Sequence, residues 1–209
     1  MYAGLDTEVG AFSVGKQDMA AVIISDMTDI TEFSGLQQYI AASSDKRDSV
    51  FAYRGGFDAL ELQATYLADD TKDEDKYSLS GLYSAPFGLD AGIAYSADDD
   101  ANQVLLGLGY SFEGLYVAGT FSTGDVSDAT EFTAYELSAA YKFTSEFSVA
   151  ANYGYVEEDT SGSKTDEVDQ FELAAYYKFN GNFRTYASYV FEQLDGGDDV
   201  FRLGARYDF

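Results

Sequence analysis

The chain has 209 residues, of which 12 are basic and 37 acidic, so its formal net charge at pH 7 is −25. This charge argues against nucleic acid as a partner, because phosphate groups are bound by Lys and Arg. The absence of Cys and His excludes disulfides, thiolate ligands and the commonest general base, and we expect no cofactor and no metal. Phe and Tyr make up 16% of the residues, which excludes a disordered acidic chain.

The first predicted elements are a short strand stub at 2–6 and a strand at 9–16, followed by a segment that does not alternate. That segment, 17–46, is far longer than any other connection and is rich in Ala, Ile and Met, so we do not expect it to extend into water. It contains three spaced acids, Asp26, Asp29 and Glu32. Two interpretations remain open: a surface loop whose acids are solvated, or a loop folded into a barrel with its carboxylates facing the lumen.

From residue 47 onward, apolar and polar side chains alternate in runs of about ten residues, and this period of two predicts β-strands. The apolar faces are clearest at 60–66, 89–95, 104–112, 147–155, 171–179 and 201–209. The opposite faces carry mainly small or polar residues and do not resemble a second packed core. Strand periodicity alone also fits a soluble antiparallel sandwich.

The connections between these runs alternate between two classes. Short connections bracketed by aromatic residues occur at 54–57, 85–88, 112–114, 143–147 and 179–183. Longer, acidic connections lie between them at 68–76, 97–102, 123–130, 157–167 and 194–199. Tight turns at one rim, long loops at the other and aromatic residues at both are typical of a sheet that crosses a bilayer.

A membrane-spanning barrel therefore explains the pattern better than a sandwich does. A tilted strand needs about 9–11 residues to cross the hydrocarbon, which matches the runs. Because lipid cannot hydrogen-bond the edges of a sheet, the sheet must close. We expect an all-β, transmembrane antiparallel β-barrel in one domain over 1–209, with Phe209 as an interfacial anchor. No apolar run is long enough for a transmembrane helix, and no signal peptide opens the chain.

Four segments resemble general diffusion porins of Gram-negative outer membranes. YAGLDTEVGAFSVGKQDM, SDMTDITEFSG and KRDSVFAYRGGFDALELQATY are similar to the segments that flank and form the third loop of these porins. AYYKFNGNFRTYASYVFEQLDGGDDVFRLGARYDF is similar to their last three strands. The resemblance implies an outer-membrane homotrimer of sixteen-stranded barrels, each around a water-filled pore narrowed by the third loop.

The number of strands differs from the family pattern. We count about twelve complete strands and the stub at 2–6, without counterparts of the first three strands and most of the fourth. We therefore expect either an N-terminally truncated porin or a smaller barrel of about twelve strands. The last strand then pairs with residues 2–6, pairs with residues 9–16, or stays open.

The resemblance also assigns residues to the pore by position. The acidic side of the constriction is assigned to Asp26, Asp29 and Glu32, and the basic wall to Lys16, Lys46 and Arg47. If Phe51 and Tyr53 face outward, strand alternation places Lys46 on the inner face and Arg47 on the outer one. A strand end or a bulge would shift this alternation, so both residues remain candidates for the basic wall. Other cations on inner-face positions are Lys142, Lys178, Arg184, Arg202 and Arg206. They form a basic ladder or pair with Glu136, Glu172 and Glu192; we favour pairing.

These features predict a channel for passive diffusion of small hydrophilic solutes and ions, surrounded by lipid and lipopolysaccharide. Carboxylates opposite cations create a field across the pore, and acidic loops attract cations, so we expect weak cation selectivity. One alternative is a structural or receptor barrel with a plugged lumen. Another is a twelve-stranded channel for acidic sugars, which would need a continuous basic stripe. We do not expect an enzyme, because barrel hydrolases use His and nothing indicates a sugar site for paired carboxylates.

Overall fold

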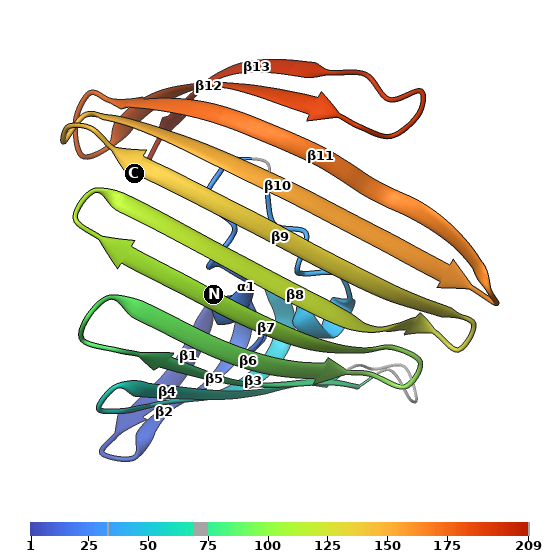
Figure 1. Ribbon diagram of the computed structural model, residues 1–209. Coiled ribbons are helices and arrows are strands. Elements are labelled where there is room, and N and C mark those ends of the chain that lie inside the picture. Colours follow the sequence, from blue (N-terminus) through green and yellow to red (C-terminus); the bar gives the residue numbers. More distant parts are fainter. Residues whose placement is uncertain (33, 69–74, 209) are drawn as a thin grey trace.

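The computed structural model describes residues 1–32, 34–68 and 75–208, so most of the predicted connection 68–76 lies outside it. Thirteen strands form one antiparallel sheet, each hydrogen-bonded to its neighbours in chain order (Figure 1). They are β1 Tyr2–Thr7, β2 Gly10–Gln17, β3 Arg47–Phe57, β4 Leu60–Leu67, β5 Lys76–Ser84, β6 Leu89–Ala97, β7 Asn102–Phe112, β8 Leu115–Ser127, β9 Thr130–Lys142, β10 Phe147–Thr160, β11 Ser163–Lys178, β12 Phe183–Glu192 and β13 Val200–Tyr207. Two short helices, α1 Val22–Ser25 and η1 Ala41–Ser43, lie between β2 and β3. Neither they nor any other helix in these ranges has the length and apolarity to cross a membrane.

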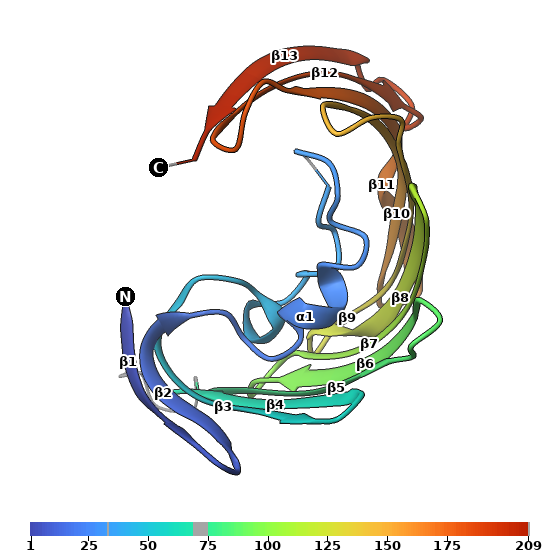
Figure 2. The same ribbon diagram turned by 90° about the vertical axis from the view of Figure 1, so that its left-hand side faces the viewer.

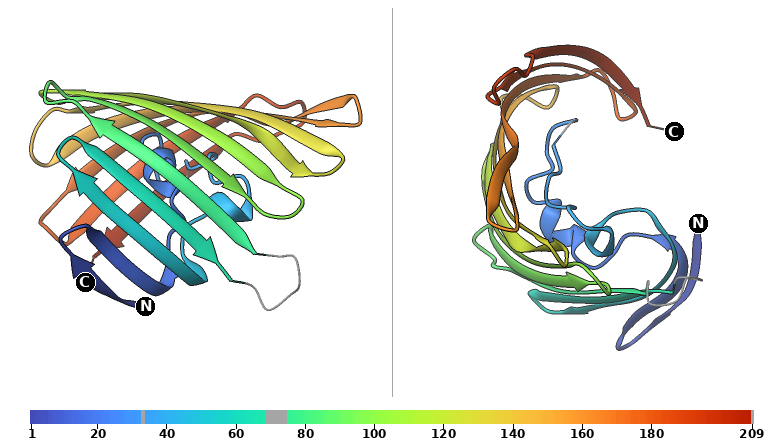
Figure 3. Two further views of the ribbon diagram at one scale, coloured as in Figure 1. Left: turned by 90° about the horizontal axis from the view of Figure 1, so that it is seen from below. Right: turned by 90° about the vertical axis from the view of Figure 1, so that its right-hand side faces the viewer.

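The sheet curls into an open cylinder, as the view in Figure 2 shows. Its edges are β1, which pairs with β2, and β13, which pairs with β12. The two edge strands, β1 in blue and β13 in red, border the open side (Figure 3). Of the three possibilities for the last strand, the structure therefore shows the open one, and the stub predicted at 2–6 is β1.

The two faces of the sheet differ in the way the alternation predicted. Large apolar side chains are exposed on the outer face, with 44% of Leu106, 60% of Leu108 and 73% of Leu203 accessible. A band of this kind is unfavourable in water and favourable in lipid. A sandwich would bury these residues against a second sheet, but the described residues form a single sheet, so the sandwich interpretation is wrong.

Two connections predicted as long acidic loops, 123–130 and 157–167, are strands over most of their length. β10 and β11 continue to the turn Ser161-Gly162, where φ is 56° and 88°. Positive φ at both positions of a two-residue turn matches the right-handed twist of the strands that it joins. An ion pair of 2.6 Å between Lys164 Nζ and Glu157 Oε1 crosses the hairpin. The prediction of loops failed because paired polar side chains support an extended strand as apolar ones do.

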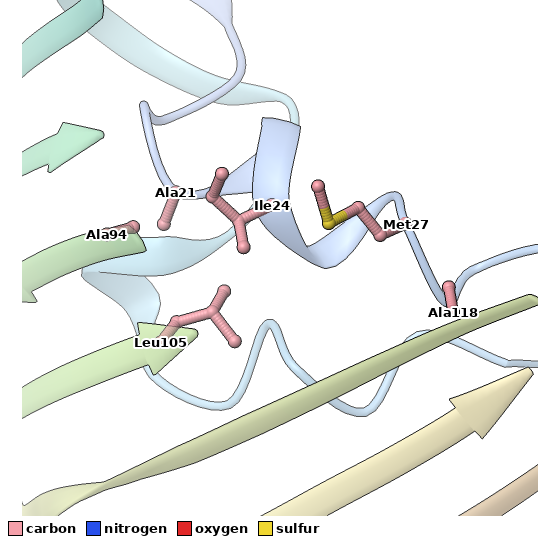
Figure 4. Close-up of a cluster of buried hydrophobic side chains, with 6 residues drawn as sticks. All are labelled: Ala21, Ile24, Met27, Ala94, Leu105 and Ala118. Carbon is pink, nitrogen blue, oxygen red and sulfur yellow. The ribbon is translucent and has the colours of Figure 1, made fainter. Parts of the chain in front are cut away.

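The segment between β2 and β3 lies inside the curve of the sheet (Figure 2). We call residues 18–46 the inserted loop. Its apolar side chains pack on the inner face of β6, β7 and β8, in a cluster shown in Figure 4: Ala21, Ile24, Met27, Ala94, Leu105 and Ala118. A second cluster joins the loop to β9 and β10: Ile40, Ala42, Phe132, Ala134 and Val156. The expectation of an inward-folded loop is confirmed, and the interpretation as a solvated surface loop is wrong.

Two glycines of the inner face make room for this packing. A Cβ atom at Gly92 would lie 2.3 Å from Ile24 Cδ1, and one at Gly107 would lie 2.6 Å from Met27 Sδ. Both distances are far below van der Waals contact. Small residues on this part of the wall therefore accommodate the inserted loop.

The glycine contacts predict that Gly92→Ala and Gly107→Ala each destabilise the folded protein by about 1–3 kcal/mol, because the added methyl overpacks the contact with the loop. Gly56→Ala is the matched control, since nothing lies within 4 Å of a Cβ built there. Urea unfolding in lipid vesicles measures the free energies, and proteolysis of the inserted loop reports its release. Equal stability of all three variants would contradict this account.

Candidate functional site: the constriction between loop and wall

Polar side chains of the wall hold the backbone of the inserted loop along its length. The Ala20 N–H donates to Thr65 Oγ1 at 2.9 Å. Near the other end of the loop, Gln103 Nε2 donates to the Gln37 carbonyl at 2.8 Å. A loop with little regular structure cannot satisfy its own buried backbone groups, so the wall provides the partners.

Thr28 and the buried Glu136 form the centre of this contact. The Thr28 hydroxyl donates to Glu136 Oε2 at 2.9 Å, and its carbonyl accepts a bond from Ser138 Oγ at 2.6 Å. Glu136 Oε1 accepts bonds from the Gly35 N–H at 3.2 Å and from Asn152 Nδ2 at 3.0 Å. Because Glu136 is fully buried, these donors replace the water that its carboxylate has lost.

Glu32 joins the loop to the last two strands. Its Oε1 lies 2.8 Å from Arg184 Nη2, and its Oε2 lies 3.9 Å from Arg206 Nη1. The Glu32 side chain is 17% exposed and that of Arg184 35%, so both are partly shielded from water. The Arg184 guanidinium also lies 5.8 Å from the centre of the Tyr176 ring, which is a cation–π contact. We call Glu32, Arg184 and Arg206 the Glu32 clamp.

The clamp corrects the expectation that these arginines pair with glutamates of the wall. The Thr31 hydroxyl of the loop donates to Glu172 Oε2 at 2.8 Å. In the sheet register Arg184 lies opposite Lys178, whereas Glu172 lies opposite Val190, six residues further along β12. Alternation placed these side chains on the correct face, but it carries no information about their height along the barrel.

Asp26 and Asp29 lie on the exposed side of the inserted loop. Their carboxylates reach solvent, but the surrounding loop and wall remove part of their hydration. This burial, followed by the charges of Asp29, Asp18 and Asp45, raises the pKa of Asp26 to about 6. Burial also raises the pKa of Asp29, while a bond of 2.9 Å from Ser34 Oγ opposes the shift. The negative charges of these neighbouring carboxylates repel one another, which makes each carboxylate harder to ionise.

Of the three predicted bases, the structure brings Lys46 to these acids. Lys46 is ion-paired with Asp45, and its charge opposes the rise in the pKa of Asp26. Arg47 begins β3 opposite Gln17 and is half-buried. It does not line the cavity described below.

Lys16 lies elsewhere than the resemblance implied. It follows Phe12 and Val14 on the exposed face of β2, while Gln17 is buried on the inner face. Its Nζ lies 3.4 Å from Asp48 Oδ2, in a pair whose side chains are 50% and 76% exposed. The period of two therefore directs Lys16 away from the lumen and from Glu32.

A cavity of about 600 Å³ lies between the inserted loop and the wall formed by β9 to β13. Its charged lining comes from the loop residues Asp29, Glu32 and Lys46 and from the wall residues Glu146, Lys178, Arg184 and Arg206. Acids on the loop thus face mainly cations on the wall. This geometry supports binding and orientation of polar solutes, and within the described residues no acidic cluster is arranged to hold a metal ion.

Phe209, the predicted interfacial anchor, lies outside the described residues. The residue before it is tied to the rim of short turns. The Asp208 N–H donates to the Asn182 carbonyl at 2.8 Å, and Asn182 Nδ2 donates to the Asp208 carbonyl at 2.7 Å. The end of β13 is therefore held at the turn between β11 and β12.

Comparisons with known proteins agree with this architecture. The outer membrane protein U of Vibrio parahaemolyticus is 35% identical over 154 residues, which cover 67% of this chain and 46% of that protein. The chain thus spans less than half the length of this relative. The fold is similar to Salmonella typhi OmpF in complex with daunomycin, with a TM-score of 0.87 and 19% identity over all of this chain and 77% of that chain. It is also similar to the trimer form of in-vitro folded OmpT from Vibrio cholerae, with a TM-score of 0.76 and 20% identity over 98% of this chain and 78% of that one.

A family model described as Gram-negative porin matches residues 1–197, nearly the whole chain. The single antiparallel sheet, its apolar outer face and the inserted loop are consistent with this match. The chain belongs to the Gram-negative porin family and is an outer-membrane protein of the β-barrel type.

Proposed function

We propose that the protein forms a water-filled channel for passive diffusion of small hydrophilic solutes and ions, with weak cation selectivity. The observation that carries the proposal is the cavity between the inserted loop and β9 to β13, whose lining is charged on both sides. A field across such an opening lets polar solutes reorient as they pass, while apolar solutes must displace ordered water. The net charge of −25 favours cations at the mouths, over a screening distance of about 8 Å at physiological salt.

Within the constriction we assign different roles to the three loop acids. Glu32 is paired with Arg184 at 2.8 Å, and Arg206, which also pairs with Asp208, lies 3.9 Å away, so Glu32 holds the loop to the wall and adds little to the negative field. Asp29 faces the cavity, and Asp26 lies close enough to share its field. These two carboxylates, opposed by Lys46, therefore carry the cation preference in this proposal.

The proposed surroundings are lipid, lipopolysaccharide and two further copies of the protein. The exposed apolar outer face fits lipid or a neighbouring subunit. A relative of the same fold has been solved in a trimer form, which supports a homotrimer. Acidic residues at the long-loop rim fit divalent cations that bridge to lipopolysaccharide phosphates.

A barrel with a plugged lumen is the second candidate, and one observation favours it. The inserted loop fills part of the interior, with Ile24 and Met27 seated over inner-face glycines. Single-channel recording in planar bilayers separates the two candidates. Stepwise ohmic conductance supports the channel, whereas its absence from correctly folded protein favours the plugged barrel.

Selectivity gives the first test of the assigned acids. A unit charge about 8 Å from a passing ion in water changes the energy of that ion by about 0.5 kcal/mol. The charge stabilises a cation and destabilises an anion by this amount, so Asp29→Asn should lower the cation-to-anion permeability ratio about fivefold. Reversal potentials across a KCl gradient measure this ratio, and Asp48→Asn is the matched control on the exposed pair with Lys16. Anion preference in the unmodified protein would overturn the proposal.

The pKa of Asp26 predicts a pH dependence. With this pKa raised to about 6, Asp26 is charged above pH 6 and becomes protonated below it, so cation preference should fall between pH 8 and pH 5. Asp26→Asn should reduce that fall. Because the folded state binds the proton more tightly than the unfolded state, the ionised carboxylate opposes folding. Asp26→Asn should accordingly be more stable than the unmodified protein at pH 8 and equal to it at pH 3; a reversed order would be inconsistent with the raised pKa.

The Glu32 clamp predicts an energetic coupling between loop and wall. A double-mutant cycle with Glu32→Gln and Arg184→Met should give a coupling of about 1 kcal/mol, at the upper end for partly exposed pairs. The exposed Lys16–Asp48 pair, treated in the same way, should give about 0.3 kcal/mol or less. Unfolding free energies supply both values. Additive effects of the Glu32 and Arg184 substitutions would show that this ion pair does not hold the loop to the wall.

A further inference from the structure

One strand of the wall extends past its neighbour. β11 is 16 residues long, from Ser163 to Lys178, but β12 pairs only with Gln170–Lys178. On its other side β11 is paired with β10 up to the turn. Within the part of the chain that the structure describes, the six residues Ser163–Val168 therefore have one side without a neighbouring strand, and Figure 1 shows β11 continuing beyond the end of β12. We call these six residues the β11 edge.

The β11 edge must lie in water, above the hydrocarbon. The paired part of β11 already has about the 9–11 residues that a tilted strand needs to cross the bilayer. β2 to β12 are paired on both sides where they cross, whereas Ser163–Val168 are not, so these six residues extend beyond the paired wall and into water. Residues 163–167 are exposed, and the outward hydroxyl of Tyr153, a residue type typical of the membrane interface, donates to Asp169 Oδ1 at 2.9 Å. The β11 edge therefore starts at the membrane–water interface and extends into water.

A sheet edge in water offers unpaired N–H and C=O groups to an additional strand. At about 3.3 Å per residue, six residues give a pairing length of about 20 Å. This is enough for a short extended peptide. The register shift opposite Val156 and Glu157 affects only one end of the edge.

The charge around the β11 edge restricts what can pair with it. Residues 157–169 contain six acidic residues and one basic residue, and that one, Lys164, is already paired with Glu157. The connection 193–199 adds three acids and no base, and it lies beside the edge because the Gln193 N–H donates to the Asp169 carbonyl at 2.8 Å. A second copy of this chain would bring the same negative charge to the edge, so self-pairing is disfavoured.

We infer that the β11 edge is a docking site for an extended cationic peptide segment, which adds as a further strand to the sheet. Backbone hydrogen bonds supply the pairing, and Lys or Arg side chains of the peptide meet the acids of the hairpin and of 193–199. The inference is independent of the channel, because the edge lies outside the lumen and outside the membrane.

The test uses a fluorescent eight-residue peptide of alternating Lys and Val, titrated with the protein in lipid vesicles. A second peptide of the same sequence carries N-methyl groups on alternate amides, which removes backbone donors and keeps the charge. A third peptide has Glu in place of Lys. Fluorescence anisotropy should show binding of the first peptide at least tenfold tighter than of the second, no binding of the third, and weaker binding at higher salt. Equal affinity of the first two peptides would overturn strand addition.

Two double variants locate the site. Asp166→Asn with Glu167→Gln removes two charges from the edge and should weaken binding of the Lys–Val peptide severalfold. Asp98→Asn with Asp99→Asn removes two charges from the turn between β6 and β7 and should leave the affinity unchanged. Equal loss in both variants would show that the peptide responds only to net charge. Self-association abolished by the edge variant would identify a second copy as the occupant and would also overturn the proposal.

Discussion

The structure depends on one constraint: inside hydrocarbon there is no water to hydrogen-bond a peptide group. A chain that crosses the bilayer as strands therefore pairs its strands with neighbours over the hydrocarbon, and β2 to β12 each have a neighbour on both sides. Antiparallel neighbours in strict chain order are the simplest way to do so, and all thirteen strands follow this order. Where β11 loses its neighbour β12, its backbone must be in water. Position in the membrane and freedom to bind a partner are thus set by the same backbone requirement.

The same requirement shapes the interior. The inserted loop brings backbone groups into the barrel, and the inner face meets them with Thr, Ser and Gln side chains rather than with apolar ones. Glycines beneath Ile24 and Met27 let the loop approach the wall closely. The small and polar residues along one side of the wall therefore receive the loop, and the cavity of about 600 Å³ lies on the side of β9 to β13.

The carboxylates between the loop and the wall have different roles. Glu136 and Glu172 are buried and accept hydrogen bonds from the loop, so these carboxylates serve the packing of the loop. Glu32 is held by arginines from the last two strands. Asp26 and Asp29 reach solvent from the loop, and the partial loss of their hydration raises the pKa of each. The carboxylates of the loop and wall thus have different roles, according to the hydrogen-bond donors and cations that the fold places around each of them.

The period of two in the sequence determined the strands, the two faces of the sheet and the number of crossings, because an extended backbone sends successive side chains to opposite sides. It determined that Arg184 and Arg206 point inward, but not that they meet Glu32, since their height depends on the register between strands and on where the inserted loop lies. It could not show that residues 123–130 and 157–167 continue as strands, because acidic composition is common to loops and to hydrated hairpins. The contacts of the two arginines and the length of these strands depend on pairing between residues far apart in the sequence, which only the tertiary structure shows.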